Sequence, residues 1–571
     1  MIRHQLSLTL IHILALPLPP IPSLARVLFL SFAAAAHLAA ASEPYPLFYD
    51  SPAPFLRAIE RAEADVRPLD QPITGVTVPH HLLAADLIAG TLRLASKHHY
   101  DRIVILGPDH FRRGTTLCST TTRLFQTPLG NVACDLPAIR ILLEDRMVSE
   151  SSLFSHEHGI QAILPFVVRW FPHTPVIPLA LDIRSRPDNW PSIASAIKRI
   201  ITPHTLIIQS TDFSHYLTQS VAAGKDQQTL MLLATGDADG IAQLNQPANL
   251  DSKASQWVQM TLQRDVFGCA APVVVDNRNA IRYGGRPNEP RTTSYIPQVY
   301  SPRFIPASAL PGEAWFFGGD THFGRGVADL FADPAQAARV RDSILAVTGS
   351  RPLIVNLEGV LTSHATAYHH PMRIGMDTGP ALRELQQLHV AAVSLANNHT
   401  LDYGKQARAD MVRILAQNHI YAADQGPPAD LGPFRLAVAT DVVNLPEPRA
   451  AILDESSFDA WRHAPADKPL FAFLHCGTEY ANSPGARERQ LADWAENAGA
   501  ALVIGCHPHR PSPAWERSAR SLRFPSMGNL IFDQTDLHNS GGLIEIRFFE
   551  QGTWAARWIP LGNLFSGKPK T

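Results

Sequence analysis

Residues 391–399 read Ala-Ala-Val-Ser-Leu-Ala-Asn-Asn-His, an apolar, strand-like run that ends in two amides and an imidazole. Four further apolar runs in the C-terminal half also end in potential ligands, at 316–322, 355–358, 473–475 and 504–509. In an α/β sheet, the carboxyl ends of the strands are where ligands are bound. The five runs therefore predict one site at the edge of such a sheet.

The side chains at these five ends favour a metal site. Together they offer carboxylate oxygen, amide oxygen and imidazole nitrogen, a set that suits Zn, Mn or Fe. A carboxylate near the middle of the set could bridge two ions about 3.5–4 Å apart. The alternative is a degenerate fold in which these residues only cap strand ends. Buried His and Asp side chains would then lack partners, at a cost in stability.

Six motifs of the C-terminal half carry a family resemblance. In chain order they are Gly-Asp-x-His, Asn-Leu-Glu-Gly, Asn-Asn-His-x-x-Asp-x-Gly, His-x-Gly-x-Glu-Tyr, Gly-x-His-Pro-His and Met-Gly-Asn-Leu-Ile-Phe-Asp. They resemble the CapA-type poly-γ-glutamate capsule-synthesis family over residues 313–565. The resemblance implies a calcineurin-like metallophosphatase fold, a β-sandwich flanked by helices. The metal-site residues that it implies are Asp320, His322, Glu358, Asn398, His399, His475, His507 and His509.

Four other positions bear on this resemblance. It implies that Asp402 and Glu479 lie behind the metal ligands or face the substrate. Two residues depart from the family's pattern: Cys476 stands where an aromatic residue is usual, and Met527 stands where a Ser-Leu-Gly-Asn pattern is more typical. Both residues are adjacent to the predicted metal site and are not part of it. The prediction of bound metal ions therefore stands, but the resemblance does not indicate which substrate is preferred.

The N-terminal half has polar strand ends of its own, at 78–81, 106–111, 155–159, 210–216 and 267–269. They contribute imidazoles, a carboxylate and a thiol. Imidazole suits both Cu and Fe, and thiolate favours Cu(I). The residues alone leave two interpretations open, a Cu or Fe site and a set of hydrogen-bonded polar groups at a loop face.

These N-terminal segments resemble the Memo-like family, also called AmmeMemoRadiSam system protein B, over roughly residues 43–300. The Pro-His, Gly-Pro-x-His, Glu-His-x-x-x-x-x-Leu-Pro-Phe and Asp-Phe-x-His segments occur in that family's order. The resemblance implies an α/β fold similar to class III extradiol dioxygenases, but dioxygenase activity does not follow from a fold. Ala270 stands where the family often has Gly. The implied pocket residues are His80, His110, Asp212, His215 and Cys269, with Glu157 and His158 as further candidates.

Length and composition predict two α/β domains. A chain of 571 residues is too long for one ordinary core. Residues 302–312 hold three prolines and one glycine, as a semi-rigid linker does, so we expect domains at 43–301 and 313–565. The formal charge of −2 excludes the broad basic surface that nucleic-acid binding requires.

The first 41 residues predict export. Arg3 and Arg26 are their only formally charged side chains, and residues 27–41 are apolar and end in three alanines. This pattern is typical of a signal peptide, with an uncleaved N-terminal anchor as the alternative. We therefore expect a periplasmic or cell-envelope protein.

The leading functional hypothesis is a metal-dependent hydrolase or transferase of envelope polymer metabolism. Its expected partners are a polyanionic or phosphorylated envelope substrate and envelope biosynthesis proteins. In a hydrolytic reaction His399 or His322 would move a proton. The alternatives are a metal-binding scaffold without turnover and a redox enzyme that uses the N-terminal pocket.

Overall fold

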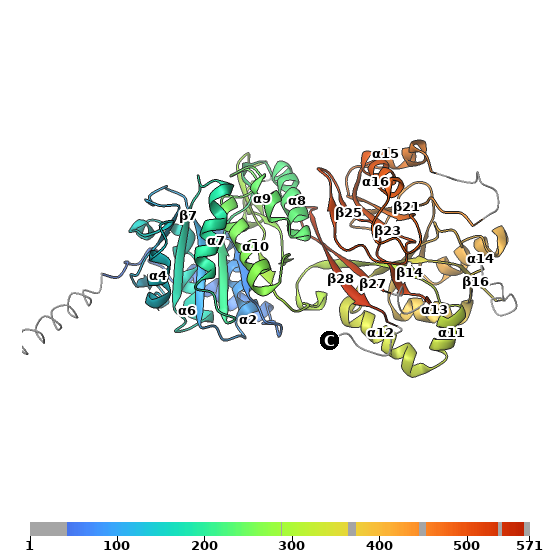
Figure 1. The fold of residues 1–571 in the computed structure, drawn as a ribbon, viewed down its shortest axis with the longest axis horizontal. Coiled ribbons are helices and arrows are strands. Elements are labelled where there is room, and N and C mark those ends of the chain that lie inside the picture. Colours follow the sequence, from blue (N-terminus) through green and yellow to red (C-terminus); the bar gives the residue numbers. More distant parts are fainter. Residues whose placement is uncertain (1–42, 287, 364–372, 445–452, 535–539, 565–571) are drawn as a thin grey trace, which may run out of the picture. The chain divides into compact units, whose positions relative to one another are not determined.

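The computed structural model describes residues 43–564, apart from 287, 364–372, 445–452 and 535–539 (Figure 1). The predicted signal peptide or anchor at 1–41 lies outside the described residues. Within the described ranges, none of the helices has the length and apolar character needed to cross a membrane. Strands before residue 302 and strands after residue 312 form separate sheets.

The N-terminal half is built on an eight-stranded mixed sheet with the order β10-β13-β1-β8-β2-β7-β3-β6. Its central strands β1, β8, β2 and β7 are parallel. The strands of this sheet are β1 (Gly75–Val78), β2 (Arg102–Asp109), β3 (Cys118–Thr120), β6 (Val148–Glu150), β7 (Val176–Asp182), β8 (Thr205–Ser210), β10 (Val273–Val274) and β13 (Gln298–Tyr300). Two smaller sheets contain β4 (Phe125–Thr127), β5 (Gly130–Val132), β9 (His215–Leu217), β11 (Arg278–Asn279) and β12 (Thr292–Tyr295).

Helices cover both faces of this sheet. Ile103 and Ile105 of β2 pack in one apolar cluster with α2, α3 and α6, while Val104 and Leu106 pack in another with α4, α7 and α10. Figure 1 shows α7 and α10 along the same face. This alternation confirms the predicted α/β class. The helices are α2 (Ala53–Asp65), α3 (Ala85–Ala95), α4 (Leu136–Leu143), α5 (His158–Gln161), α6 (Leu164–Trp170), α7 (Trp190–Lys198), α8 (Gln219–Thr235), α9 (Ala238–Ala242) and α10 (Lys253–Phe267).

In the described residues of the C-terminal half, the strands form two larger sheets and one small one. The first has the order β19-β18-β15-β14-β27-β28, with β26 also paired to β14, and the second has the order β20-β21-β22-β23-β25-β24. Strands of the first are β14 (Glu313–Thr321), β15 (Leu353–Leu357), β18 (Val390–Ser394), β19 (Tyr421–Ala423), β26 (Asn529–Ile531), β27 (Gly541–Phe548) and β28 (Trp554–Gly562). Those of the second are β20 (Ala429–Asp430), β21 (Arg435–Thr440), β22 (Leu470–His475), β23 (Ala500–Cys506), β24 (Glu516–Arg517) and β25 (Leu522–Phe524). The small sheet pairs β16 (Val360–Thr362) with β17 (Gly375–Asp377).

The two larger sheets pack face to face. Phe317 and Ile354 of the first sheet share an apolar cluster with Phe471 and Ile504 of the second. Separate clusters lie between the first sheet and its helices, and between the second sheet and α16. The predicted β-sandwich flanked by helices is confirmed. The helices are α11 (Arg325–Phe331), α12 (Pro334–Thr348), α13 (Thr378–Gln387), α14 (Gly404–Gln417), α15 (Asp459–Arg462) and α16 (Ala486–Asn497).

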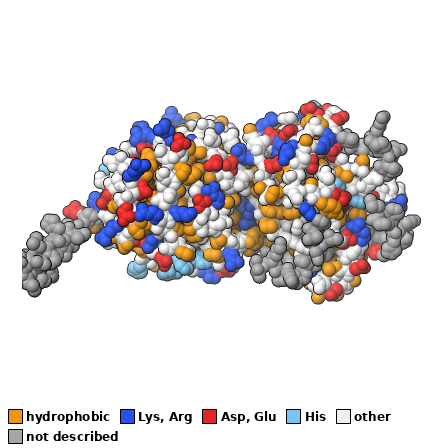
Figure 2. Space-filling view, viewed as in Figure 1, with side chains coloured by type: hydrophobic (Ala, Val, Ile, Leu, Met, Phe, Trp, Pro, Cys, Tyr) orange, Lys and Arg blue, Asp and Glu red, His pale blue; other side chains and the backbone are white. Residues whose placement is uncertain are grey.

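Charged side chains of both signs are interspersed over the face seen in Figure 2. This agrees with the near-zero net charge of the chain.

Candidate metal centres

The C-terminal candidate residues come from both sheets of the sandwich. Asp320 lies near the end of β14, and Glu358 follows β15, which is parallel to β14. His475 ends β22, and His507 follows the parallel strand β23. Each parallel pair delivers its side chains to one edge of its sheet, so four distant segments of the chain meet there.

Asp320, Glu358 and His509 form the first group of potential ligands. One ligand atom from each lies within 4.8 Å of the others, and all three residues are buried. The Nδ1 atom of His509 is 3.2 Å from Asp320 Oδ2 and 2.8 Å from Asn529 Oδ1. Two buried carboxylates beside each other repel unless a cation or a proton lies between them.

His475 connects this group to a second set of potential ligands. Its Nε2 atom is 2.8 Å from Asn398 Oδ1, and its Nδ1 atom is 3.7 Å from Asp320 Oδ1. Cys506 joins these residues, since His475 Nδ1 lies 3.3 Å from its sulfur. His507 is grouped with His509 and with the exposed Glu479. The structure therefore brings six of the predicted positions into one region, namely Asp320, Glu358, Asn398, His475, His507 and His509.

The two predicted proton carriers are each held by a carboxylate. His399 Nδ1 is 2.7 Å from Asp402 Oδ2, and its Nε2 is 3.7 Å from Glu358 Oε1. His322 Nε2 is 3.1 Å from Asp533 Oδ1. A carboxylate on one ring nitrogen fixes the orientation of an imidazole. Asp402 therefore lies behind His399.

Two residues of this region were not singled out from the sequence. Asp533 contacts both His322 and Arg325, and it accepts a hydrogen bond from the backbone of Gly326. Asn356 donates to Asp320 Oδ1 at 2.8 Å. Asp533 is the last residue of the sixth motif, Met-Gly-Asn-Leu-Ile-Phe-Asp. The sequence therefore drew attention to Asp533 only through the family resemblance, which did not assign it a function.

Unpaired buried atoms test whether a metal fits here. Glu358 Oε2 and His507 Nδ1 are buried and have no hydrogen-bond partner. Burial and the neighbouring Asp320 raise the pKa of Glu358, whereas burial and the neighbouring His507 lower the pKa of His475. Unpaired oxygen and nitrogen atoms among buried carboxylates and neutral imidazoles match what a divalent ion binds. The described residues fit a metal.

A second cluster lies where strands of the N-terminal sheet end. His80 follows β1, His110 follows β2 and Asp212 follows β8. Because β8 pairs in parallel with both β1 and β2, the three ends share one edge. Asp212 Oδ1 accepts a hydrogen bond from the backbone N–H of His80 at 3.0 Å.

Asp251 completes this cluster and was missed in the sequence. Its Oδ2 atom is 3.1 Å from His80 Nε2 and 3.5 Å from His110 Nε2. Asp251 follows no strand-like run. It stands directly before Ser252, the residue whose side chain caps α10, so its sequence context is that of an ordinary helix start.

Glu157 holds His110 from the other side. Its carboxylate accepts from His110 Nδ1 at 2.7 Å and from the backbone N–H of Gly159 at 2.8 Å. Burial opposes protonation of His110, but hydrogen bonds to Asp251 and Glu157 outweigh it and raise the pKa of His110 to about 10. The site therefore attracts positive charge.

The remaining N-terminal candidates divide into two sets. The ring of His158 stacks on that of His110 with centroids 4.4 Å apart. His215, in contrast, contacts the carbonyl of Phe213 and the ring of Tyr216. Cys269 lies in an apolar cluster, with its sulfur 3.1 Å from the carbonyl oxygen of Ser301. Within the described residues, the groups of potential ligands around His80 include neither His215 nor Cys269.

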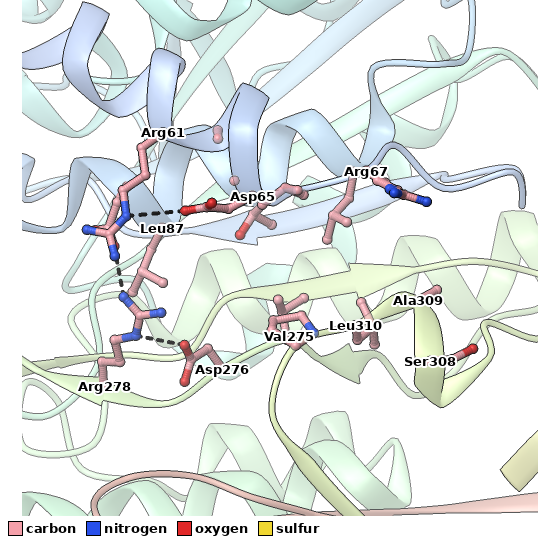
Figure 3. A pocket seen from close by; sticks show the side chains of 17 residues that line it. Arg61, Asp65, Arg67, Leu87, Val275, Asp276, Arg278, Ser308, Ala309 and Leu310 are labelled. Atoms are coloured by element: carbon pink, nitrogen blue, oxygen red, sulfur yellow. Dashed lines mark hydrogen bonds and ion pairs between the residues drawn. The ribbon is translucent and has the colours of Figure 1, made fainter. Parts of the chain in front are cut away.

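A separate cavity of 430 Å³ lies beside α2 and α3 (Figure 3). Part of its charged lining is internally paired, because Arg278 contacts Asp86 at 2.8 Å and Asp276 at 2.7 Å. Leu87 and Val275 contribute apolar surface. None of the predicted site residues is among those that line it.

Comparison with known proteins covers both halves of the chain. Residues 49–264 match the family described as Memo-like protein, and residues 314–427 and 461–534 match the family described as Bacterial capsule synthesis protein PGA_cap. A MEMO1 family protein from Methanopyrus kandleri is 28% identical over 192 residues, which is 32% of this chain and 68% of that protein. Another, from Thermotoga petrophila, is 30% identical over 176 residues, which is 30% of this chain and 63% of that protein.

The relative that matches the C-terminal half is the PGA biosynthesis protein CapA of Bacillus subtilis. It is 25% identical over 293 residues, which is 46% of this chain and 72% of that protein. Both resemblances found in the sequence are thereby confirmed. The chain joins a Memo-like part, matched at residues 49–264, to a part of the bacterial capsule synthesis protein type, matched between residues 314 and 534.

Proposed function

We propose that the C-terminal part is a metal-dependent hydrolase or transferase that acts on a phosphorylated or γ-glutamyl-linked substrate of envelope polymer metabolism. One observation carries the proposal. Asp320, Glu358 and His509 converge in a buried group, while Glu358 Oε2 and His507 Nδ1 have no partner. Divalent cations bound within these groups of ligands would satisfy such atoms.

Different residues would bind the metal and transfer the proton. A bound metal ion would supply Lewis-acid chemistry to a phosphoryl or carbonyl oxygen. His399 would move a proton at Nε2, because Asp402 holds its other nitrogen. His322, held by Asp533, is the second candidate for this role. The residues that would hold the metal are Asp320, Glu358, Asn398, His475, His507 and His509.

We further propose that the protein works outside the cytoplasm, in the periplasm or cell envelope. The apolar first 41 residues support export. The similarity to CapA, a PGA biosynthesis protein, supports a polymeric substrate.

Turnover by the full chain tests the hydrolytic function. The protein would be loaded with Mn, Zn or Fe and assayed with phosphomonoesters, phosphodiesters and γ-glutamyl peptides. Asp320→Asn should lower kcat/KM on the order of 100-fold or more, because it weakens a ligand shared by both groups. His463→Ala, at an exposed histidine, is the matched control and should leave turnover unchanged.

Two results would separate this function from its alternative. Hydrolysis that Asp320→Asn abolishes in a folded protein supports the proposal. Metal retained by the wild type with no hydrolysis of any of these substrates would contradict it and favour a metal-binding scaffold.

A further inference from the structure

The cluster formed by His80, His110 and Asp251 lies in the N-terminal half of the chain, whereas the proposed hydrolase site lies in the C-terminal half. Three electron-rich atoms meet there: Nε2 of His80, Nε2 of His110 and Oδ2 of Asp251, with the oxygen 3.1 and 3.5 Å from the two nitrogens. His80 and Asp251 are 2% and 6% exposed. The side chain of His110 is 20% exposed, so the cluster is closed on the side of His80 and Asp251 and is reached from the side of His110.

Hydrogen bonds on the far side of each ring decide where the protons lie. Ser210 donates its hydroxyl proton to the carbonyl oxygen of Gly159, so it can only accept from His80 Nδ1, 3.2 Å away. His110 Nδ1 likewise donates to the carboxylate of Glu157. In neutral imidazoles with protonated Nδ1, both Nε2 atoms carry lone pairs. Both lone pairs would then lie toward Asp251, where one cation could be bound by both nitrogens and the carboxylate.

Further buried oxygen atoms lie at the same place. Asp251 Oδ1 is buried and has no hydrogen-bond partner. The second carboxylate, that of Asp212, lies 3.7 Å from His80 Nε2. His80, Asp212 and Asp251 form one group of potential ligands, and His80, His110 and His158 form another. The cluster thus has more ligand atoms than a single proton would satisfy.

The backbone fixes Asp251 in this place. Leu250 forms a bridge with Phe213, and the backbone N–H of Asp251 donates to the carbonyl of Asp212 at 3.1 Å. In return the backbone N–H of Asp212 donates to Asp251 Oδ2 at 3.2 Å. The loop before α10 is therefore pinned to the end of β8. A ligand pinned on two sides keeps its geometry without the metal.

We propose that His80, His110 and Asp251 form a metal centre with only nitrogen and oxygen ligands, which takes a divalent cation and does not select Cu(I). Soft thiolate ligands select Cu(I), and the thiol of Cys269 lies in a separate apolar cluster. Two imidazoles with one carboxylate are the ligands of non-haem Fe(II) sites. Fe(II) is the expected occupant, with Zn(II), Mn(II) and Co(II) as competent substitutes.

Co(II) is the probe for this centre because its absorption spectrum reports the ligands. The full chain, without a polyhistidine tag and with Asp320→Asn to weaken the C-terminal site, would be titrated with Co(II) under reducing, anaerobic conditions. About one Co(II) per chain should bind, with ligand-field bands and no thiolate charge-transfer band. Asp251→Ala should weaken Co(II) binding at least about 10-fold.

Two further variants make the assignment decisive. Asp251→Cys should keep the Co(II) and add a thiolate charge-transfer band, and should raise the affinity for Cu(I). Cys269→Ala should leave both the spectrum and the affinity unchanged. Should Asp251→Ala fail to fold by circular dichroism, Asp251→Asn keeps the side-chain shape and should show the same loss.

Three results would overturn the proposal. They are the absence of bound Co(II) in the folded Asp320→Asn protein, unchanged binding in a folded Asp251 variant, and a thiolate band that Cys269→Ala removes. Failure of the hydrolase proposal would not produce any of them, because the C-terminal site is weakened throughout.

Discussion

Asp402 provides a residue-scale test of the hydrolase proposal. Its carboxylate holds His399 Nδ1 at 2.7 Å and accepts from the backbone N–H of Ile374 at 2.7 Å. Asp402→Asn would leave the histidine without a charged acceptor, so we expect kcat to fall about 10–100-fold. Asp410→Asn, at a carboxylate bonded only to Gln406 and Arg413 in the contacts described for α14, is the control. Equal kcat for the two variants would contradict a role for Asp402 in positioning His399.

Glu496 provides a residue-scale test of stability against pH. It is 8% exposed and accepts from Ser521 Oγ at 2.6 Å and from Arg523. Burial raises its pKa, but hydrogen bonds from Ser518, Ser521 and Arg523 outweigh burial and lower it to about 2. Because the folded-state pKa lies below the ordinary value of 4.5, the stabilisation is full above pH 4.5 and is lost as the pH falls toward 2.

Glu496→Gln should therefore lower the free energy of unfolding by about 1–3 kcal/mol at neutral pH. The difference from wild type should shrink as the pH falls below 4.5. Urea unfolding at several pH values measures it, with Glu60→Gln on an exposed position of α2 as the control. If the difference in free energy of unfolding between wild type and Glu496→Gln grew as the pH fell, the lowered pKa of Glu496 would be contradicted.

Single residues also show which parts of the sites the sequence reveals. Asp320, Glu358 and His475 could be predicted because each ends or follows an apolar run, and strand ends meet in space. Asp251 could not, because it precedes a helix, where an acidic residue has an ordinary capping explanation. Cys269 was assigned to the pocket because it follows a segment read as a strand end and because the family resemblance implied it, but it lies in a separate apolar cluster.

At the scale of elements, Gly319 controls how closely β14 approaches the segment before β26. A Cβ at Gly319 would lie 1.9 Å from the carbonyl oxygen of Gly528. Since the backbone cannot yield cheaply, Gly319→Ala should destabilise the protein by more than about 3 kcal/mol or prevent folding. Gly224→Ala, in the middle of α8 with nothing within 4 Å, should instead stabilise by about 0.5–1 kcal/mol.

Thermal unfolding of both variants checks this contrast. A Gly319→Ala protein as stable as the wild type would mean that β14 and the Gly528 carbonyl do not approach as described. Because β14 carries Asp320, a displacement of β14 in Gly319→Ala should weaken the metal site as well. On heating, this variant should release its metal before it loses secondary structure.

Elements could be predicted where a single pattern dominates. The apolar run at 102–106 is part of β2, and the run at 391–395 overlaps β18. The amphipathic segment at 82–96 contains α3. The order of strands within each sheet could not be predicted, because hydrophobic runs do not specify their neighbours. The antiparallel pairing of β3 with β7, beside parallel strands, is one such case.

At the scale of the whole molecule, both halves place polar side chains at the carboxyl ends of parallel strands. The two family resemblances and the α/β class could be read from the sequence. The boundary at 302–312 and export through residues 1–41 remain predictions. The central claim is that the C-terminal cluster is a metal centre.

Anomalous diffraction from crystals of the full chain loaded with Mn or Zn tests that claim most directly. We predict an anomalous peak between Asp320, Glu358 and His509 in the wild type. The same peak should be absent from crystals of a folded Asp320→Asn protein. Metal-loaded crystals with ordered side chains here and no anomalous peak among these residues would contradict the account.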